Sequence, residues 1–289
     1  MGVNKMNNSS EGLRSRPPAT IIRPAQSKNL ISDVREIFEY RELFFTLATR
    51  DIKVRYKQSL FGVLWILIQP IATCIVFTFV FGHLVRIDSG DIPYPVFVFS
   101  GLLLWQFFSR NLGEGVSSLV ANSAFINKVY FPRIGIPLIG MFSSAIDFML
   151  ALLVLFVLML WYGVEFKIQI LALPIILAAT ILLSFSLALI FSPLNAIYRD
   201  VGLMMGYGTQ FLMYLSPVIY PVTFVPEQYH WLYDFNPVAT LLNGSRWALI
   251  GAPLPSIQSI GILLTFITIC FILGRKIFRN LEPTIVDRI

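Results

Sequence analysis

Residues 134–162 read IGIPLIGMFSSAIDFMLALLVLFVLMLWY. This run contains a single ionisable side chain, Asp147. A helix needs about 20 predominantly apolar residues to cross the ~30 Å hydrocarbon core of a bilayer. The stretch therefore predicts a membrane-spanning helix, and it sets the class of the whole chain.

Five further apolar stretches flank this one, at 62–81, 94–108, 170–191, 203–219 and 257–273. Of the 289 residues 56% are hydrophobic and 13% are charged, whereas soluble domains average about 25% charged residues. The sequence predicts an all-α polytopic membrane protein with six transmembrane helices.

The formal net charge of +6 is unevenly distributed. If the N-terminus is cytoplasmic and the chain crosses six times, every Lys and Arg lies on the cytoplasmic side except Arg86, Lys167 and Arg246. Cytoplasmic loops of membrane proteins carry such an excess. Both termini are therefore expected in the cytoplasm. The basic excess then reflects topology and attraction to anionic lipid, and no nucleic-acid partner is expected.

Motifs for catalysis and for metal binding are missing from the sequence. It contains no GxxxxGK[ST] phosphate loop, no HExxH and no GxSxG. The two cysteines, Cys74 and Cys270, lie inside apolar stretches, where a thiol usually behaves as a small hydrophobe. We expect no catalytic site, no cofactor and no metal in this chain.

The composition divides the chain into four parts. A flexible cytoplasmic tail (1–29) precedes an amphipathic interface helix (30–59), the membrane domain (60–282) and a C-terminal cytoplasmic tail (283–289). The interface helix either lies on the membrane surface and leads into the first span or packs as an ordinary cytoplasmic helix. A separate short helix is expected at 109–122.

Five prolines interrupt the apolar region 220–255. Two short helices fit there, at 226–233 and 237–249. The second has Asn236 as its N-cap, Pro237 at its first position and Gly251 as its stop. Irregular backbone at membrane depth is tolerated only inside protein or beside a water-filled cavity. We therefore expect re-entrant or interfacial helices that gate the outer mouth of a pathway.

Asp147 and a group of aromatic residues are candidates for lining that pathway. A charge inside a span must face protein or water, or be neutral. Asp147 therefore either lines a path or makes an interhelical hydrogen bond. Tyr207, Phe211 and Tyr214 share one helical face. Aromatic faces beside hydroxyl groups suit sugars, although Tyr and Trp are also common at any membrane interface.

Ten short motifs, in this order, carry a resemblance to a known family: YREL (40–43), RDIKVRYKQS (50–59), LW (64–65), QP (69–70), PYPVFVFSGL (93–102), WQFF (105–108), KVYFPR (128–133), YRDV (198–201), LSPVIYP (215–221) and NP (236–237). The chain resembles the permease subunits of ABC-2 type polysaccharide exporters. The resemblance runs from about residue 20 to the C-terminus.

The resemblance implies a bacterial inner-membrane complex of two permease copies and two copies of a separate ABC ATPase. ATP and Mg²⁺ are used by that partner. The permease homodimer encloses a channel for a polyprenyl-pyrophosphate-linked polysaccharide, of the O-antigen or teichoic-acid kind. Membrane lipid surrounds the complex.

The resemblance also assigns residues to three roles. The lipid pyrophosphate is expected at the cytoplasmic mouth, on Arg50, Lys53, Arg55 and Lys57, which equally serve as topology anchors. The channel or its gate is expected to use Trp65, Gln69, Trp105, Phe108, Tyr207, Phe211, Tyr214, Tyr220, Phe224 and Trp231. Coupling to the ATPase is expected at Glu114, Asn127, Lys128, Arg133, Tyr198, Arg199 and Asp200. The Arg199–Asp200 pair equally fits a structural cap.

Two other classes of protein fit the sequence less well. A membrane-embedded glycosyl- or acyltransferase needs a His or carboxylate site at a membrane face, and the sequence shows none. A secondary transporter needs several charges inside its spans or an internal repeat, and only Asp147 qualifies.

Overall fold

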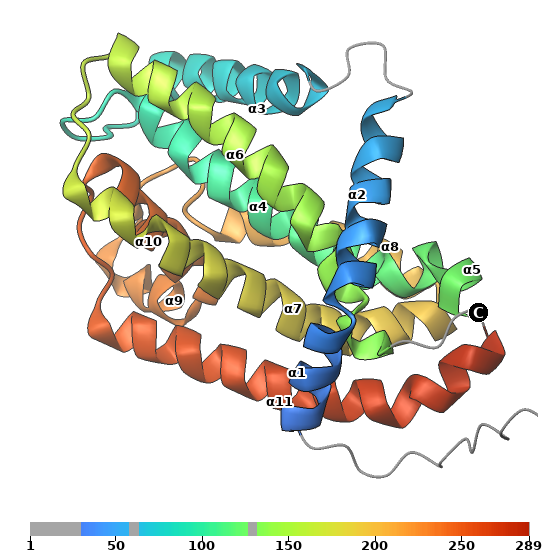
Figure 1. Ribbon diagram of the computed structural model, residues 1–289. Coiled ribbons are helices and arrows are strands. Elements are labelled where there is room, and N and C mark those ends of the chain that lie inside the picture. The colour runs from blue at the N-terminus through green and yellow to red at the C-terminus, as the bar shows by residue number, and fades with distance from the viewer. Residues whose placement is uncertain (1–29, 58–63, 127–131, 289) are drawn as a thin grey trace, which may run out of the picture.

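The computed structural model describes residues 30–57, 64–126 and 132–288, and in these ranges the chain is helical, without strands. Side chains are described for 30–54, 67–126 and 132–285. The expected N-terminal tail lies outside the described residues. The helices pack into a bundle, with the two N-terminal helices crossing it on one side (Figure 1).

The expected interface helix consists of two helices, α1 (Leu30–Glu39) and α2 (Arg41–Lys57). The break is a kink at Tyr40, because helical hydrogen bonds continue through it: the Tyr40 amide donates to Glu36 O at 3.0 Å and the Phe44 amide donates to Tyr40 O at 3.2 Å. The polypeptide therefore changes direction without a loop.

Helix α4 (Tyr94–Ala121) is the centre of the bundle. It packs against α3 (Leu64–Phe77), α6 (Pro137–Trp161), α7 (Leu173–Ile197) and α10 (Pro237–Ile250). The separate helix expected at 109–122 is wrong, because α4 continues to Ala121. Gly115 is needed in that continuation, since a Cβ there would lie 2.7 Å from Ala188 Cβ on α7.

Shorter elements complete the chain. They are η1 (Thr78–Leu84), a π-helical extension of α3, then α5 (Ser123–Ile126), η2 (Arg133–Gly135), η3 (Ile168–Ala172), α8 (Asp200–Leu215), η4 (Val222–Phe224), η5 (Glu227–Tyr229) and α9 (His230–Phe235). The last helix, α11 (Ile257–Arg288), runs along α7 (Figure 1).

Four helical stretches in the described part of the chain are long and apolar enough to span a membrane. They are Leu67–Leu84, Arg133–Trp161, Ile168–Ile197 and Ile257–Ile285. The expected spans at 94–108 and 203–219 are not among them. Helix α4 contains Arg110 and Glu114, and α8 has only 16 residues.

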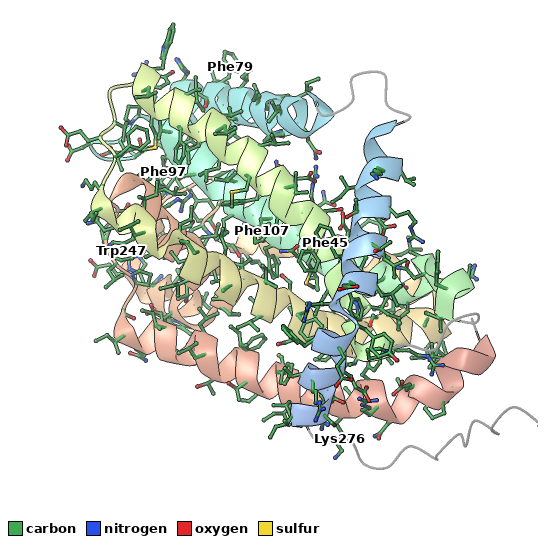
Figure 2. All side chains as sticks on the ribbon, viewed as in Figure 1. Phe45, Phe79, Phe97, Phe107, Trp247 and Lys276 are labelled. Atoms are coloured by element: carbon green, nitrogen blue, oxygen red, sulfur yellow. The ribbon has the colours of Figure 1, made fainter. Side chains whose placement is uncertain are left out.

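Two apolar clusters form the core. The larger surrounds the first half of α4, with Phe99, Leu102 and Phe108 buried in it. The smaller joins α2, the end of α4, α6, α7 and α11. Figure 2 shows Phe97 among the helices and Phe79 at the edge of the molecule, where Phe79 is 60% exposed. Large exposed apolar side chains of this kind are typical of a protein surrounded by lipid.

Candidate functional site

The candidate site is the irregular segment between α8 and α10, here called the broken segment (residues 216–236). The segment ends at the start of α10, where the predicted N-cap is confirmed. Asn236 Oδ1 accepts hydrogen bonds from the amides of Val238 at 3.0 Å and Ala239 at 3.3 Å. Gly251, with φ +69°, ends α10. The helix expected at 226–233 is instead the 3₁₀ turn η5 followed by α9.

Side chains from two other helices bind the backbone of this segment where it leaves α8. Arg246 on α10 donates through Nη1 to Pro217 O at 2.5 Å and through Nη2 to Val218 O at 2.6 Å. Tyr94 on α4 donates its hydroxyl to Ile219 O at 2.7 Å. Three successive carbonyl groups without helical partners are thereby satisfied, as buried backbone requires.

Arg246 itself is buried, with 2% of its surface exposed. Its guanidinium lies over the Phe97 ring, 3.9 Å from the centroid, which adds a cation–π attraction. A Cβ at Gly101 would lie 2.5 Å from Arg246 Nη2 and 2.4 Å from Val218 O, so glycine is required there. Arg246 was predicted on the outer side of the membrane, and that side stays a prediction; its burial was not predicted.

The rest of the broken segment is held by tyrosine and asparagine side chains. The Tyr220 hydroxyl donates to Tyr214 O at 2.9 Å and lies 3.1 Å from the Tyr233 hydroxyl. Burial, together with the hydrogen bond to Tyr233, raises the pKa of Tyr220, which therefore stays protonated. Asn236 Nδ2 donates to Ser216 Oγ at 3.0 Å, joining the two ends of the segment.

The predicted channel aromatics fall into two groups. Tyr207, Phe211 and Tyr214 are all exposed, by 66%, 67% and 55%, on a helix with no buried residue. Phe224 and Trp231 are exposed as well, and so is Gln69. The side chain of Trp65 lies outside the described residues.

Trp105 and Phe108 differ from those aromatics, because both are buried in the core with their ring centroids 5.8 Å apart. Their rings pack inside one copy of the chain and present almost no surface to a substrate. Gln106 and Arg110, on the same helix, are among the α4 residues that do reach a surface.

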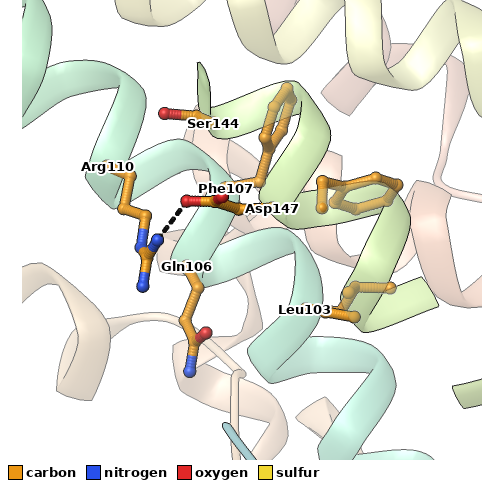
Figure 3. A pocket seen from close by; sticks show the side chains of 8 residues that line it. Leu103, Gln106, Phe107, Arg110, Ser144 and Asp147 are labelled. Carbon is orange, nitrogen blue, oxygen red and sulfur yellow. Dashed lines mark hydrogen bonds and ion pairs between the residues drawn. The ribbon is translucent and has the colours of Figure 1, made fainter. Parts of the chain in front are cut away.

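Asp147 forms an ion pair with Arg110, joining α6 to α4 (Figure 3). Asp147 is 5% exposed and Arg110 is 30% exposed. A small pocket beside them is lined by Gln106, Ser144 and Phe107 among others. Of the two alternatives from the sequence, the interhelical contact is the one observed. The acid was identified from sequence, but Arg110 was assigned to the cytoplasmic side and its partnership was missed.

One turn further along the same interface, Ser144 Oγ donates to Glu114 Oε2 at 3.4 Å. Glu114 therefore lies between α4 and α6, two turns before the end of α4. Glu114 is partly exposed there, and its contact with an ATPase stays a prediction.

The four cations of the expected pyrophosphate site have different surroundings. Arg50 donates to Asp51 Oδ1 and, at 3.0 Å, to Asn122 Oδ1, and its guanidinium lies 4.5 Å from the Phe125 ring centroid. It therefore ties α2 to the end of α4. Lys53 is exposed. The side chains of Arg55 and Lys57 lie outside the described residues.

Three of the expected coupling residues lie together at the turn between α7 and α8, where Tyr198, Arg199 and Asp200 are exposed. Beneath them Asn195 is buried, accepting from the Gly202 amide at 2.8 Å and donating to Val116 O on α4 at 3.2 Å. Asn127 and Lys128 lie outside the described residues.

Arg133 belongs to a charged cluster that joins both ends of the described chain. It lies 3.7 Å from Glu282, which also accepts from Arg279 at 2.9 Å. Arg279 and Arg275 on α11 both bind Asp33 on α1, the latter at 2.8 Å. Asp33 is 3% exposed, whereas its neighbours Ile31, Val34 and Phe38 are 59–79% exposed.

Comparison with known proteins identifies the relatives of this chain. Residues 42–250 match the ABC-2 type transporter family. The chain is 30% identical over 242 residues to the O-antigen export system permease protein RfbA of Klebsiella pneumoniae, covering 83% of this chain and 92% of that protein. The RfbA of Myxococcus xanthus is 25% identical over 90% of this chain and 100% of its own length. The polysialic acid transport protein KpsM of Escherichia coli is 25% identical over 83% of this chain and 93% of its own length.

Proposed function

The chain belongs to the ABC-2 type transporter family, and from that membership we propose that it is the membrane subunit of an exporter for a bacterial polysaccharide. Its relatives, which include O-antigen export permeases and a polysialic acid transport protein, support this substrate class. The substrate of the proposed exporter is a polymer linked to polyprenyl pyrophosphate.

In the proposed topology the chain crosses the inner membrane six times, through α3 with η1, α4, α6, α7, α8 and α11. Both termini are cytoplasmic. Four of these helices have the length and hydropathy of a span, and the charge bias of the loops supports the orientation. The broken segment then lies on the outer side.

The observation that carries the proposal is the exposed aromatic face of α8, with Tyr207, Phe211 and Tyr214. Rings with hydroxyl groups suit the alternating apolar and polar surfaces of sugars. In the proposal two copies of the chain bring these faces together around the polymer. Phe224 and Trp231 of the broken segment gate the outer mouth of that pathway.

A separate ATPase supplies the energy in this proposal, with ATP and Mg²⁺ bound in that partner. The exposed turn of Tyr198, Arg199 and Asp200 is the proposed contact, supported from below by Asn195. The complex contains two copies of each protein. The purified permease alone is expected to hydrolyse no ATP, since its sequence has no phosphate loop.

The pyrophosphate of the lipid carrier is proposed to bind at the cytoplasmic end of α2, to Lys53, Arg55 and Lys57. A cluster of cations near a membrane attracts anionic headgroups, and a charged donor makes strong hydrogen bonds to phosphate. Arg50 is assigned a lesser part, because Asp51 and Asn122 already accept its hydrogen bonds.

Export in a strain that carries only a variant permease tests the proposal. Lys53→Ala with Arg55→Ala is expected to lower surface polysaccharide at least about tenfold, since two charged hydrogen bonds of about 1.5–3 kcal/mol each are lost. The lipid-linked polymer should accumulate inside. The matched control is Arg35→Ala, which removes an exposed cation that pairs with Glu39 on α1. Unchanged export in the double variant would indicate that these cations only fix the orientation of the chain in the membrane.

A further inference from the structure

We propose that Arg246 is a positioning residue for the outer gate. It holds residues 216–219, here called the floor, fixed against α4 and α10, so that gating motion is confined to residues 221–235, here called the arm. This inference rests on the proposed function, because it takes the broken segment to be the gate.

The floor is bound through its backbone. Its carbonyl groups at Pro217, Val218 and Ile219 accept hydrogen bonds from Arg246, Arg246 and Tyr94 at 2.5, 2.6 and 2.7 Å. All four floor residues are buried, and Ser216 and Val218 are 0% exposed. A backbone held at three consecutive carbonyl groups cannot rotate at one residue without losing a bond at the next.

The guanidinium of Arg246 packs closely against α4. The Phe97 ring lies over the guanidinium, and Gly101 leaves the space that a Cβ would occupy. Both the ring and the glycine belong to α4, whereas Arg246 belongs to α10. The planar, bidentate guanidinium of Arg246 therefore joins α4, α10 and the floor. A lysine cannot reproduce that fork, because its ammonium is a point charge.

The arm has much weaker attachments. Phe224, Tyr229, Trp231 and Phe235 are 47–60% exposed. Among the side-chain bonds that join it to the rest of the described chain are the contact of Tyr233 with Tyr220 at 3.1 Å and the bond from Ser259 to Asp234 at 2.8 Å. Each is a single bond between side-chain groups, which a rotamer change can break.

The arm begins and ends next to residues that lie outside the regular helices. Pro221 before η4 and Asn236 after α9 both have extended backbone, with φ/ψ of −76°/152° and −85°/109°. Hydrogen bonds within the arm join its own residues to one another. One such internal bond joins the His230 ring to Val225 O at 2.8 Å. The same 15-residue unit contains the exposed aromatic residues of the proposed gate.

Cysteine labelling of the assembled transporter tests this division. Cys74 and Cys270 are first replaced by alanine, and single cysteines are placed at Val218 in the floor and Trp231 in the arm. A membrane-impermeant maleimide is added outside, with and without ATP. With Arg246 present, we expect Trp231→Cys to change its labelling rate at least twofold with ATP and Val218→Cys to remain unlabelled.

Arg246→Lys is then expected to raise labelling of Val218→Cys at least about tenfold and to lower export, at an unchanged amount of assembled complex. Tyr94→Phe removes one of the three bonds and keeps the ring, and it should raise labelling of Val218→Cys about threefold. This variant provides the test if Arg246→Lys assembles poorly. Arg86→Lys, at an exposed arginine, is the control and should change neither rate.

Two results would overturn the inference. One is labelling of Val218→Cys with intact Arg246, since the floor would then move with the arm. The other is an unlabelled floor in both variants despite lost export, which would limit Arg246 to folding. Labelling of Trp231→Cys only from the cytoplasm would instead contradict the proposed topology. The difference between floor and arm would still be measurable from that side.

Discussion

Arg110 and Arg246 both lie at contacts between helices, but their charges are stabilised in different ways. Arg110 pairs with the carboxylate of Asp147, and the bond joins two side chains on neighbouring helices. Arg246 binds two backbone carbonyl groups and an aromatic face. No carboxylate of the described residues is within ion-pair distance of Arg246.

The difference decides what each arginine can hold in place. A side-chain pair fixes the register of α4 against α6, and both partners can be exchanged together by mutation. A backbone acceptor has no side chain to exchange, so the need for a donor at Pro217 and Val218 persists in every variant. The first arrangement suits a packing contact, and the second suits an irregular stretch that must keep its shape.

The largest effect is expected from Arg246→Met. It removes two hydrogen bonds from a charged donor, worth about 1.5–3 kcal/mol each, so the free energy of unfolding should fall by about 3–6 kcal/mol. Thermal unfolding of the detergent-purified protein measures this as a large drop in midpoint. A midpoint near that of the parent protein would mean that water replaces Arg246 without cost.

The next effect concerns the ion pair. Asp147→Leu leaves the Arg110 charge without that carboxylate, which should cost less than the about 3–5 kcal/mol of a fully buried pair, because Arg110 is 30% exposed. The double variant Arg110→Met with Asp147→Leu should recover most of that loss, because replacing both members by apolar residues is often neutral. If the double variant is no more stable than Asp147→Leu, the pair has a role beyond packing. No second substitution is expected to rescue Arg246→Met.

Gly101→Ala should cost about 1–3 kcal/mol, the usual range for overpacking. The added Cβ would lie within 2.5 Å of both Val218 O and Arg246 Nη2. The matched control is Gly113→Ala on the same helix, where a Cβ meets nothing within 4 Å. That control should stabilise by about 0.5–1 kcal/mol, since glycine in a helix interior is unfavourable. Equal midpoints of thermal unfolding for the two variants would contradict close packing around Gly101.

The smallest effect is expected from Tyr94→Phe, at about 0.5–1.5 kcal/mol for one neutral hydrogen bond. Ile219 O loses its donor, but the two bonds from Arg246 remain. The midpoint of thermal unfolding should shift by a few degrees. A loss as large as that of Arg246→Met would transfer the main anchoring role to the tyrosine.

Sequence reasoning succeeded where a short motif determines local geometry. The Asn236-Pro237 start and the Gly251 stop of α10 were predicted, because caps depend on residues next to one another. It identified Asp147 because a carboxylate is rare in an apolar run. It missed Arg110 and Arg246 as partners, since pairing depends on how α4, α6 and α10 pack in space. It also ended a span at Phe108, although α4 continues through Arg110 and Glu114 because neighbouring helices supply their partners.

The ion pairs of Asp33 can form only late in the synthesis of the chain. Its partners Arg275 and Arg279 follow it by 242 and 246 residues, so during synthesis α1 is made long before these two arginines. The contact between α1 and α11 forms only after α11 has been made. In a nascent chain that lacks α11, α1 does not have the ion pairs of Asp33 with Arg275 and Arg279. Formation of the α1–α11 ion pairs therefore distinguishes a chain that contains α11 from one in which α11 has not yet been made.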